Sequence, residues 1–141
     1  MAGTPDLKRF IVAQQRDYNI AFAEVVAGRK RSHWMWYIFP QIKGLGFSST
    51  SQRYGINGLK EADIYLRHPV LGERLITICR ALLDLEVNDA NLVFGSPDDL
   101  KLKSSMTLFA AVPDSDLVFQ QVLEKYFQGK ADLHTLTLLN R

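Results

Sequence analysis

The sequence lacks most of the residue groupings that mark metal sites, redox centres and phosphate-binding loops. Its single cysteine, Cys79, excludes a disulfide within the chain and is typical of a reducing compartment. The three histidines, His33, His68 and His134, lie far apart, and neither HExxH nor CxxC occurs, so we expect no metal and no cofactor. P-loop, GxGxxG and GxSxG motifs are also absent, which argues against the common glycine-rich phosphate-binding loops and against the nucleophile motif of serine hydrolases.

Long hydrophobic runs are missing as well. The longest, Trp34 to Pro40, is much too short to cross a bilayer. Residues 1–8 show no basic region followed by an apolar one, as a signal peptide would. The sequence therefore predicts a cytoplasmic protein with no membrane partner. Its 141 residues, of which 47% are hydrophobic, predict one domain with its own core, residues 1–141.

Apolar residues recur at helical spacing along most of the chain, which predicts an all-α, multihelical fold. Thr4 and Pro5 are typical of a helix start, and Gly28 is placed to end that helix. Ser96 followed by Pro97 indicates another capped start. Further apolar stripes run over residues 59–66, 71–85, 102–109, 119–126 and 133–139. Cys79 belongs to such a stripe, so we expect it in the core rather than as a nucleophile.

The region after Gly28 has no clear helical period. The apolar run within residues 34–40 fits either a short buried helix or a minor strand pair. Gly44 and Gly46, followed by the serine cluster of residues 48–51, predict a loop or turn.

Charge is gathered into two blocks, although the net charge is only +2. Residues 28–54 contain five bases and no acid, and residues 84–99 contain five acids and no base; they are Arg29, Lys30, Arg31, Lys43 and Arg53, and Asp84, Glu86, Asp89, Asp98 and Asp99. Such blocks usually form solvated faces. The first, which we call the basic segment (residues 28–54), also holds both tryptophans.

The basic segment combines the residue types that bind phosphate-bearing ligands. The planar guanidinium of arginine forms bidentate hydrogen bonds to phosphate, an aromatic ring can stack on a base, and glycine lets the backbone approach a ligand closely. The candidate ligand-binding residues here are Arg29, Lys30, Arg31, Ser32, His33, Trp34, Trp36, Gln41, Gly44, Gly46, Ser48 and Ser49. The alternative is structural: the tryptophans would lie in the core, and the bases would face solvent or neutralise helix carbonyls.

A second candidate lies further along the chain. Lys101, Ser104 and Ser105 fall on one face of a predicted helix, beside its apolar stripe. These side chains could complete an anion site, or form an ordinary solvated face.

The string Gly28-Arg29-Lys30-Arg31-Ser32-His33-Trp34-Met35-Trp36, continuing through Phe39-Pro40-Gln41 and Gly44-Leu45-Gly46, closely resembles a bacterial family known as domain of unknown function 1810. Residues 61–72, 99–109 and 132–139 are similar to the same family. The resemblance implies an all-α fold. Members are often labelled calpastatin, but inhibitors of that type are disordered, whereas this chain has the apolar content of a folded domain.

A more distant resemblance is to the NAD/ADP-ribose-associated family that acts on N-glycosidic bonds. The segments that resemble it are Ser48–Glu61, Lys101–Met106 and Lys125–Phe127. This resemblance implies that Glu61 is the acid–base carboxylate and that Lys101 holds a phosphate or ribose.

These observations leave three hypotheses open. In the first, the domain binds a phosphate-bearing small molecule, a nucleotide or ADP-ribose derivative, and as an enzyme would cleave an N-glycosidic bond in it, with Glu61 as the catalyst. In the second, it is a non-enzymatic protein- or nucleic-acid-binding module. In the third, the basic segment is a structural lock that holds the first helix to the rest through buried tryptophans.

Overall fold

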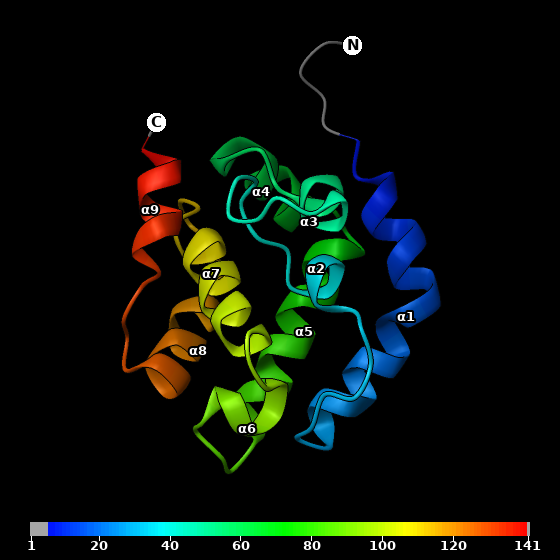
Figure 1. Cartoon of the computed structure of the whole chain (residues 1–141), viewed down its shortest axis with the longest axis vertical. Helices are drawn as coiled ribbons and strands as arrows, with labels where there is room; N and C mark the ends of the chain where they lie inside the picture. The colour runs from blue at the N-terminus through cyan, green and yellow to red at the C-terminus, as the bar shows by residue number, and fades with distance from the viewer. Residues whose placement is uncertain (1–5, 141) are drawn as a thin grey trace.

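This computed structural model describes residues 6–140, which contain nine helices (Figure 1). In chain order they are α1 (Lys8–Val26), α2 (Met35–Ile38), α3 (Ser49–Tyr54), α4 (Leu59–Arg67), α5 (Leu71–Asp84), α6 (Ala90–Phe94), α7 (Asp98–Ala110), α8 (Val118–Phe127) and α9 (Leu133–Leu139). Within the described residues there is no sheet, and one parallel bridge joins Ile42 to Ile56. The predicted all-α fold is confirmed.

Helix α1 ends where the sequence predicts. Gly28 adopts a φ of +78°, which favours glycine, and its N–H donates to the carbonyl of Val25 at 2.9 Å. The Arg29 N–H donates to the carbonyl of Glu24 at 3.0 Å. The start signal at Thr4 and Pro5 lies outside the described residues, within which the helix begins at Lys8.

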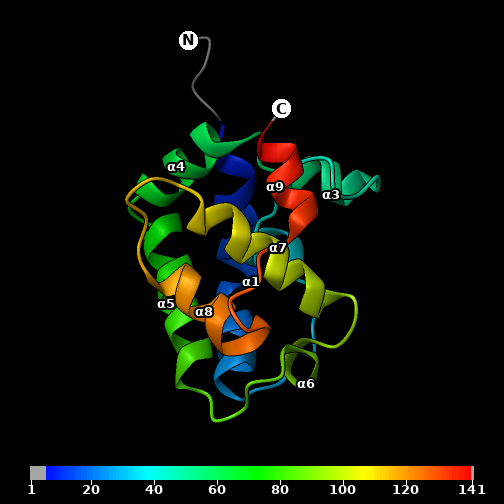
Figure 2. The ribbon, with the colours of Figure 1, turned by 90° about the vertical axis from the view of Figure 1, so that its left-hand side faces the viewer.

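The hydrophobic side chains of the core form one cluster, to which α1, α5, α7 and α8 all contribute. The stripe of α5 and the stripe Leu102, Met106 and Phe109 of α7 are buried, as predicted. Helices α8 and α9 pack against the same side of α7 (Figure 2), which also contacts α4 and α6. Because neighbours surround it, α7 buries its polar residues Ser104 and Ser105 too.

Cys79 is fully buried beside Met106, with 3.6 Å between the two sulfur atoms. Burial raises the pKa of the Cys79 thiol well above its usual range. The thiol is therefore protonated at neutral pH and unreactive, which agrees with the predicted place in the core.

Two local predictions in the basic segment are settled by the fold. The apolar run of residues 34–40 contains the short helix α2, so the strand-pair alternative is wrong. The serine cluster predicted as loop is the helix α3, because the Ser48 hydroxyl accepts the N–H of Ser51 at 3.1 Å and caps it. Short polar helices of this kind carry no apolar stripe by which they could be recognised.

The predicted cap of α7 also differs from the structure. Its helix begins at Asp98, and the Ser96 hydroxyl donates to Asp99 Oδ1 at 3.3 Å instead of accepting a backbone N–H. The Asp99 carboxylate accepts the Leu100 N–H at 2.8 Å. An acid of the first turn therefore takes part of the role expected of the serine.

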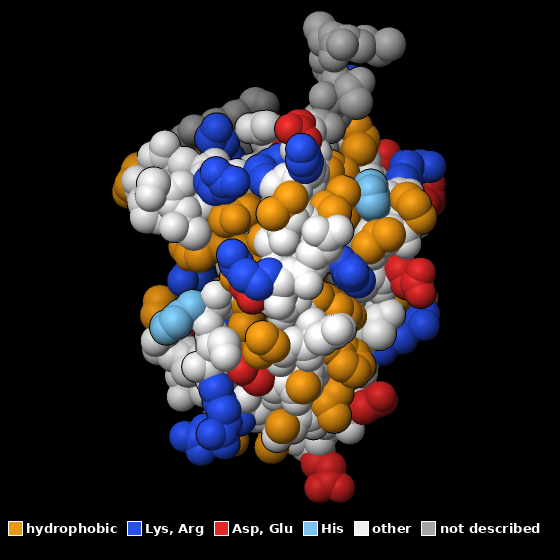
Figure 3. Space-filling view, turned by 90° about the vertical axis from the view of Figure 1, so that its right-hand side faces the viewer, with side chains coloured by type: hydrophobic (Ala, Val, Ile, Leu, Met, Phe, Trp, Pro, Cys, Tyr) orange, Lys and Arg blue, Asp and Glu red, His pale blue; other side chains and the backbone are white. Residues whose placement is uncertain are grey.

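The outer face of α1 mixes hydrophobic and charged side chains (Figure 3). Val12, Ile20 and Val26 of this helix are 53%, 48% and 55% exposed. Exposed apolar residues of this kind are common on protein surfaces. Among the described residues, no helix combines the length and the apolar character needed to cross a membrane.

Candidate ligand-binding site

The start of the basic segment is fixed in place by Glu24 of α1. The Glu24 carboxylate accepts hydrogen bonds from the N–H groups of Arg31 (2.8 Å) and Ser32 (3.0 Å), from the Ser32 hydroxyl (2.6 Å) and from the Trp34 indole Nε1 (2.9 Å). Burial raises the pKa of Glu24, but these four hydrogen bonds outweigh burial and bring the pKa to about 2. Glu24 is therefore ionised at neutral pH and organises residues 31–34.

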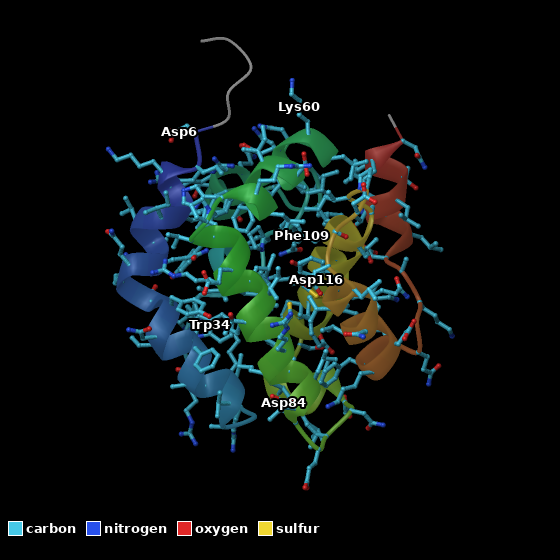
Figure 4. The ribbon with its side chains drawn as sticks, turned by 180° about the vertical axis from the view of Figure 1, so that it is seen from behind. Asp6, Trp34, Lys60, Asp84, Phe109 and Asp116 are labelled. Carbon is cyan, nitrogen blue, oxygen red and sulfur yellow. The ribbon has the colours of Figure 1, made fainter. Side chains whose placement is uncertain are left out.

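Trp34 is a core residue. Its side chain is 1% exposed and packs against Phe39 and Phe94, with ring centroids 6.1 and 6.3 Å apart. Figure 4 labels Trp34 beside α1. Together with the Ser32–Glu24 bonds, this burial agrees with the structural-lock hypothesis for residues 32 and 34.

The basic segment packs against the acidic block of residues 84–99. The Lys30 N–H donates to the carbonyl of Val93 at 2.7 Å, and Lys30 Nζ lies 2.8 Å from Asp98 Oδ2. Lys101 Nζ, one turn along α7, lies 3.1 Å from Asp98 Oδ1. Burial raises the pKa of Asp98, but the bonds from the two lysines lower it overall. Asp98 thus brings two cations together.

Trp36, unlike Trp34, is half-buried and faces a hollow. Lys101 Nζ lies over its ring, 4.4 Å from the centroid, in a cation–π contact. Two cavities share Trp36 and Lys101 in their walls, so both border on this contact. We call the two together the Trp36 hollow.

The first cavity, which we call the lysine cavity, has a volume of about 370 Å³. Its other lining residues are Lys30, His33, Trp34, Met35, Tyr37, Thr50 and Asp98. The second, the glutamine cavity, has a volume of about 330 Å³ and is further lined by Gln41, Leu45, Pro97, Leu100, Ser104, Asp132 and His134.

Gln41 is the most deeply placed amide of the hollow. Its side chain is 4% exposed, and within the described residues Nε2 has no hydrogen-bond partner. The bridge next to it fixes its backbone: the Gln41 carbonyl accepts the Ile56 N–H at 2.9 Å, and the Lys43 N–H donates to Ile56 at 2.7 Å. Gln41 therefore lines the glutamine cavity from a rigid backbone, and its amide nitrogen is covered by protein atoms without a hydrogen-bond partner.

Asp132 supplies a carboxylate to the glutamine cavity. The Thr135 hydroxyl, the Ser104 hydroxyl (2.8 Å) and the Thr135 N–H (3.3 Å) all donate to its Oδ2. Burial raises the pKa of Asp132, but these bonds lower it overall. Both carboxylates of the hollow, Asp98 and Asp132, are therefore ionised at neutral pH.

The structure brings part of the predicted set together and separates the rest. The predicted residues that line the hollow are Lys30, His33, Trp34, Trp36, Gln41, Lys101 and Ser104. Those that line neither cavity are Arg29, Arg31, Ser32, Gly44, Gly46, Ser48, Ser49, Ser105 and Glu61. Arg29 and Arg31 are exposed, whereas Ser105 is fully buried in the core.

Gly44 and Gly46 of the basic segment make close contacts within the protein. A Cβ at Gly46 would lie 3.0 Å from the Ser51 hydroxyl oxygen and 3.6 Å from the Trp36 ring. Gly44 has a φ of +108°, and its Cα faces the side chain of Leu138. Both positions are accounted for by contacts within the protein.

Glu61 is placed away from the hollow, in the first turn of α4. Its carboxylate is 5% exposed, accepts the Asn57 N–H at 2.8 Å and pairs with Arg9 at 3.5 Å. Lys125, in another segment that resembles the N-glycosidase family, also makes contacts within the fold. Its ammonium group donates to carbonyls at the end of α5, those of Leu82 (3.2 Å), Leu83 (2.8 Å) and Leu85. These contacts stabilise the fold, and Glu61 lines neither cavity of the hollow.

Several lining residues escaped the sequence analysis, chiefly Asp98, Asp132 and His134. Asp98 has the pattern of an ordinary first-turn acid, and nothing in its spacing indicates that Lys30 lies beside it. Asp132 and His134 do lie in the stretch of residues 132–139 that resembles the unknown-function family. That stretch was the available signal for them.

Comparison with known proteins identifies the family. The model of a family described as "Protein of unknown function (DUF1810)" matches residues 4–139. The chain belongs to this family. A crystal structure of another protein, the conserved hypothetical protein Rv1873 from Mycobacterium tuberculosis, is 47% identical to it with a TM-score of 0.94, covering 96% of this chain and 97% of that one. No curated protein matches.

Membership in the DUF1810 family confirms the closer of the two resemblances, and the all-α fold agrees with it. These comparisons do not extend to the N-glycosidase family, so that resemblance stays a prediction. Nor do they support the calpastatin label. In the described part of this DUF1810 chain, no three His, Cys, Asp or Glu side chains are grouped as a metal site requires.

Proposed function

We propose that the Trp36 hollow binds a phosphate-bearing small molecule, a nucleotide or an ADP-ribose derivative. The observation that carries the proposal is the Lys101 ammonium held over the Trp36 ring at 4.4 Å, with Lys30 brought to the same place by Asp98. Two cations therefore stand beside a flat aromatic face in a hollow. Lysine ammonium groups bind phosphate, and an indole face stacks on a base.

The size of the hollow supports a small ligand. Its cavities of about 370 and 330 Å³ lie near the lower end of the range for ligand pockets, roughly 300–1,000 Å³. Each would take one part of a nucleotide, and together they would take a whole one. The lysine cavity holds two lysines against one aspartate, which suits the phosphate.

Cleavage of an N-glycosidic bond stays a prediction beyond binding. A general acid needs a raised pKa, whereas the pKa values of Asp98 and Asp132 are both lowered. Ionised carboxylates can stabilise the positive charge that develops on a sugar ring as its glycosidic bond breaks. If turnover occurs in the hollow, we therefore expect it to use these two residues rather than Glu61.

The alternative, a nucleic-acid-binding module, rests on the exposed Arg29 and Arg31 beside Lys30. Contacts with a phosphate backbone release counterions, so the affinity of such a module would fall steeply with salt. The two functions therefore use different residues of the same segment.

Calorimetric titration tests the proposal. We expect AMP, ADP-ribose and ribose 5-phosphate each to bind at least about tenfold tighter than adenosine, since charge-assisted hydrogen bonds to phosphate each contribute about 1.5–3 kcal/mol. Arg31→Ala, outside the hollow, should change these affinities less than about threefold. Absence of binding by every phosphate compound at millimolar concentration would contradict the proposal. Salt-sensitive binding of single-stranded RNA, lost in Arg31→Ala, would favour the alternative.

Asp98 should weaken phosphate binding, because its carboxylate occupies the space between Lys30 and Lys101 that an incoming anion would enter. Asp98→Asn is expected to raise the affinity for ribose 5-phosphate about fivefold, the effect of about 1 kcal/mol for a partly exposed ion pair. Asp99→Asn is the matched control, since Asp99 lies on the same turn but outside both cavities. Equal affinities of the two variants would show that Asp98 does not compete with the ligand.

A further inference from the structure

We infer that the glutamine cavity takes the base of the ligand, a planar heteroaromatic ring that stacks on Trp36 and hydrogen-bonds to the side-chain amide of Gln41. Gln41 would then be the residue that determines specificity for the base. The inference rests on the proposed function, because phosphate in the lysine cavity leaves the glutamine cavity to the rest of the ligand.

The first support is the unsatisfied amide itself. Nine in ten or more of the buried polar groups in proteins have a hydrogen-bond partner, and leaving one without a partner is costly. Gln41 Nε2 has none within the described residues, although its side chain is 4% exposed and its backbone is fixed by the bridge to Ile56. A half-turn of the amide about its last bond exchanges its nitrogen and oxygen, and would bring this donor to a ligand acceptor in the cavity.

The second support is the chemistry of the walls. Leu45, Pro97 and Leu100 are apolar, and Trp36 adds a flat face. Apolar walls with a few placed polar groups are typical of sites for ring systems. This cavity therefore suits a base better than it suits a sugar or a second phosphate.

The third support is charge. The glutamine cavity pairs Lys101 with the ionised Asp132, whereas the lysine cavity holds Lys30 and Lys101 against Asp98 alone. A phosphate in the glutamine cavity would meet the Asp132 carboxylate and be repelled by it. The charges therefore orient the ligand, with its phosphate towards Lys30 and its base towards Gln41.

The test compares ligands that share a phosphate and differ in the base. We expect at least one of AMP, GMP, UMP and CMP to bind about tenfold tighter than ribose 5-phosphate. Gln41→Met, which keeps the length of the side chain and removes its hydrogen bonds, should weaken that nucleotide about fivefold and leave ribose 5-phosphate within about twofold. Gln121→Met on the exposed face of α8 is the control for the replacement and should change neither affinity.

Two outcomes separate this inference from the proposed function. If ribose 5-phosphate binds as tightly as every nucleotide, or Gln41→Met leaves the nucleotide affinity unchanged, the inference is overturned while phosphate binding stands. If no phosphate compound binds, both the inference and the proposed function are overturned. NMR of the unmodified protein avoids the risk that a variant misfolds. The side-chain amide resonances of Gln41 should shift on adding the nucleotide and stay in place on adding ribose 5-phosphate. A shift with ribose 5-phosphate and none with the nucleotide would overturn the inference.

Discussion

Replacing Glu24 by alanine is expected to lower the free energy of unfolding by about 3 kcal/mol. The substitution removes the acceptor of four hydrogen bonds and leaves the N–H of the buried Trp34 indole without a partner. Urea denaturation measures the loss. Glu124→Ala, at an exposed position of α8, is the control and should cost less than about 0.5 kcal/mol. Equal stabilities of the two variants would show that the Glu24 network does not hold the basic segment.

The same residue predicts how stability depends on pH. Because the folded-state pKa of Glu24, about 2, lies below its ordinary value of 4.5, its contribution is present in full above pH 4.5. That contribution is lost as the pH falls from 4.5 towards 2. Glu24→Gln, which cannot ionise, should therefore lose less stability than wild type over this interval. Parallel acid curves for the two proteins would contradict the assignment.

Replacing Lys101 by methionine is expected to weaken the binding of phosphate compounds about 30-fold. The change removes a charge-assisted hydrogen bond to the phosphate, about 2 kcal/mol, while the methionine keeps an apolar stem over Trp36. Calorimetry with ribose 5-phosphate measures the loss, and thermal unfolding checks that the variant folds.

Lys103→Met provides the matched control. Lys103 lies on the same helix and carries the same charge, but it lines neither cavity. A general electrostatic effect of α7 would weaken binding equally in both variants, whereas a site at the Trp36 hollow requires the loss in Lys101→Met alone. Equal losses would therefore place the phosphate elsewhere.

The sequence predicts the fold wherever apolar stripes are long. Helices α5 and α8 bury the residues that their spacing indicates, and Gly28 ends α1 as its position suggests. Helices α3 and α6 could not be predicted in this way, since each has six residues or fewer and depends on one capping side chain. Stability of such short helices comes from the surrounding fold rather than from their own sequence.

The candidate site was predicted only in part, for reasons of geometry. The residue types at Lys30, Trp36, Gln41 and Lys101 indicate ligand chemistry, but Lys101 is far from the others in sequence. Only the packing of α7 beside the basic segment brings them together. Arg29 and Arg31 are equally good candidates by type, but they are exposed and line neither cavity.

The two tryptophans show what spacing cannot resolve. Trp34 and Trp36 are two residues apart in a segment without a clear period, so neither could be assigned to the core from the sequence. The deciding contact is the hydrogen bond from the Trp34 indole to Glu24, ten residues earlier in the chain. That bond turns Trp34 inwards and leaves Trp36 beside Lys101.

This difference between the tryptophans allows a direct test of the Trp36 hollow as a nucleotide site. The protein has two tryptophans, and therefore two indole N–H signals in a nitrogen-15 NMR spectrum. On titration with ADP-ribose, the Trp36 signal should shift progressively to saturation, while the signal of Trp34, bonded to Glu24, should move little. Shifts confined to Trp34, or no shift of either signal at millimolar ADP-ribose, would contradict the account.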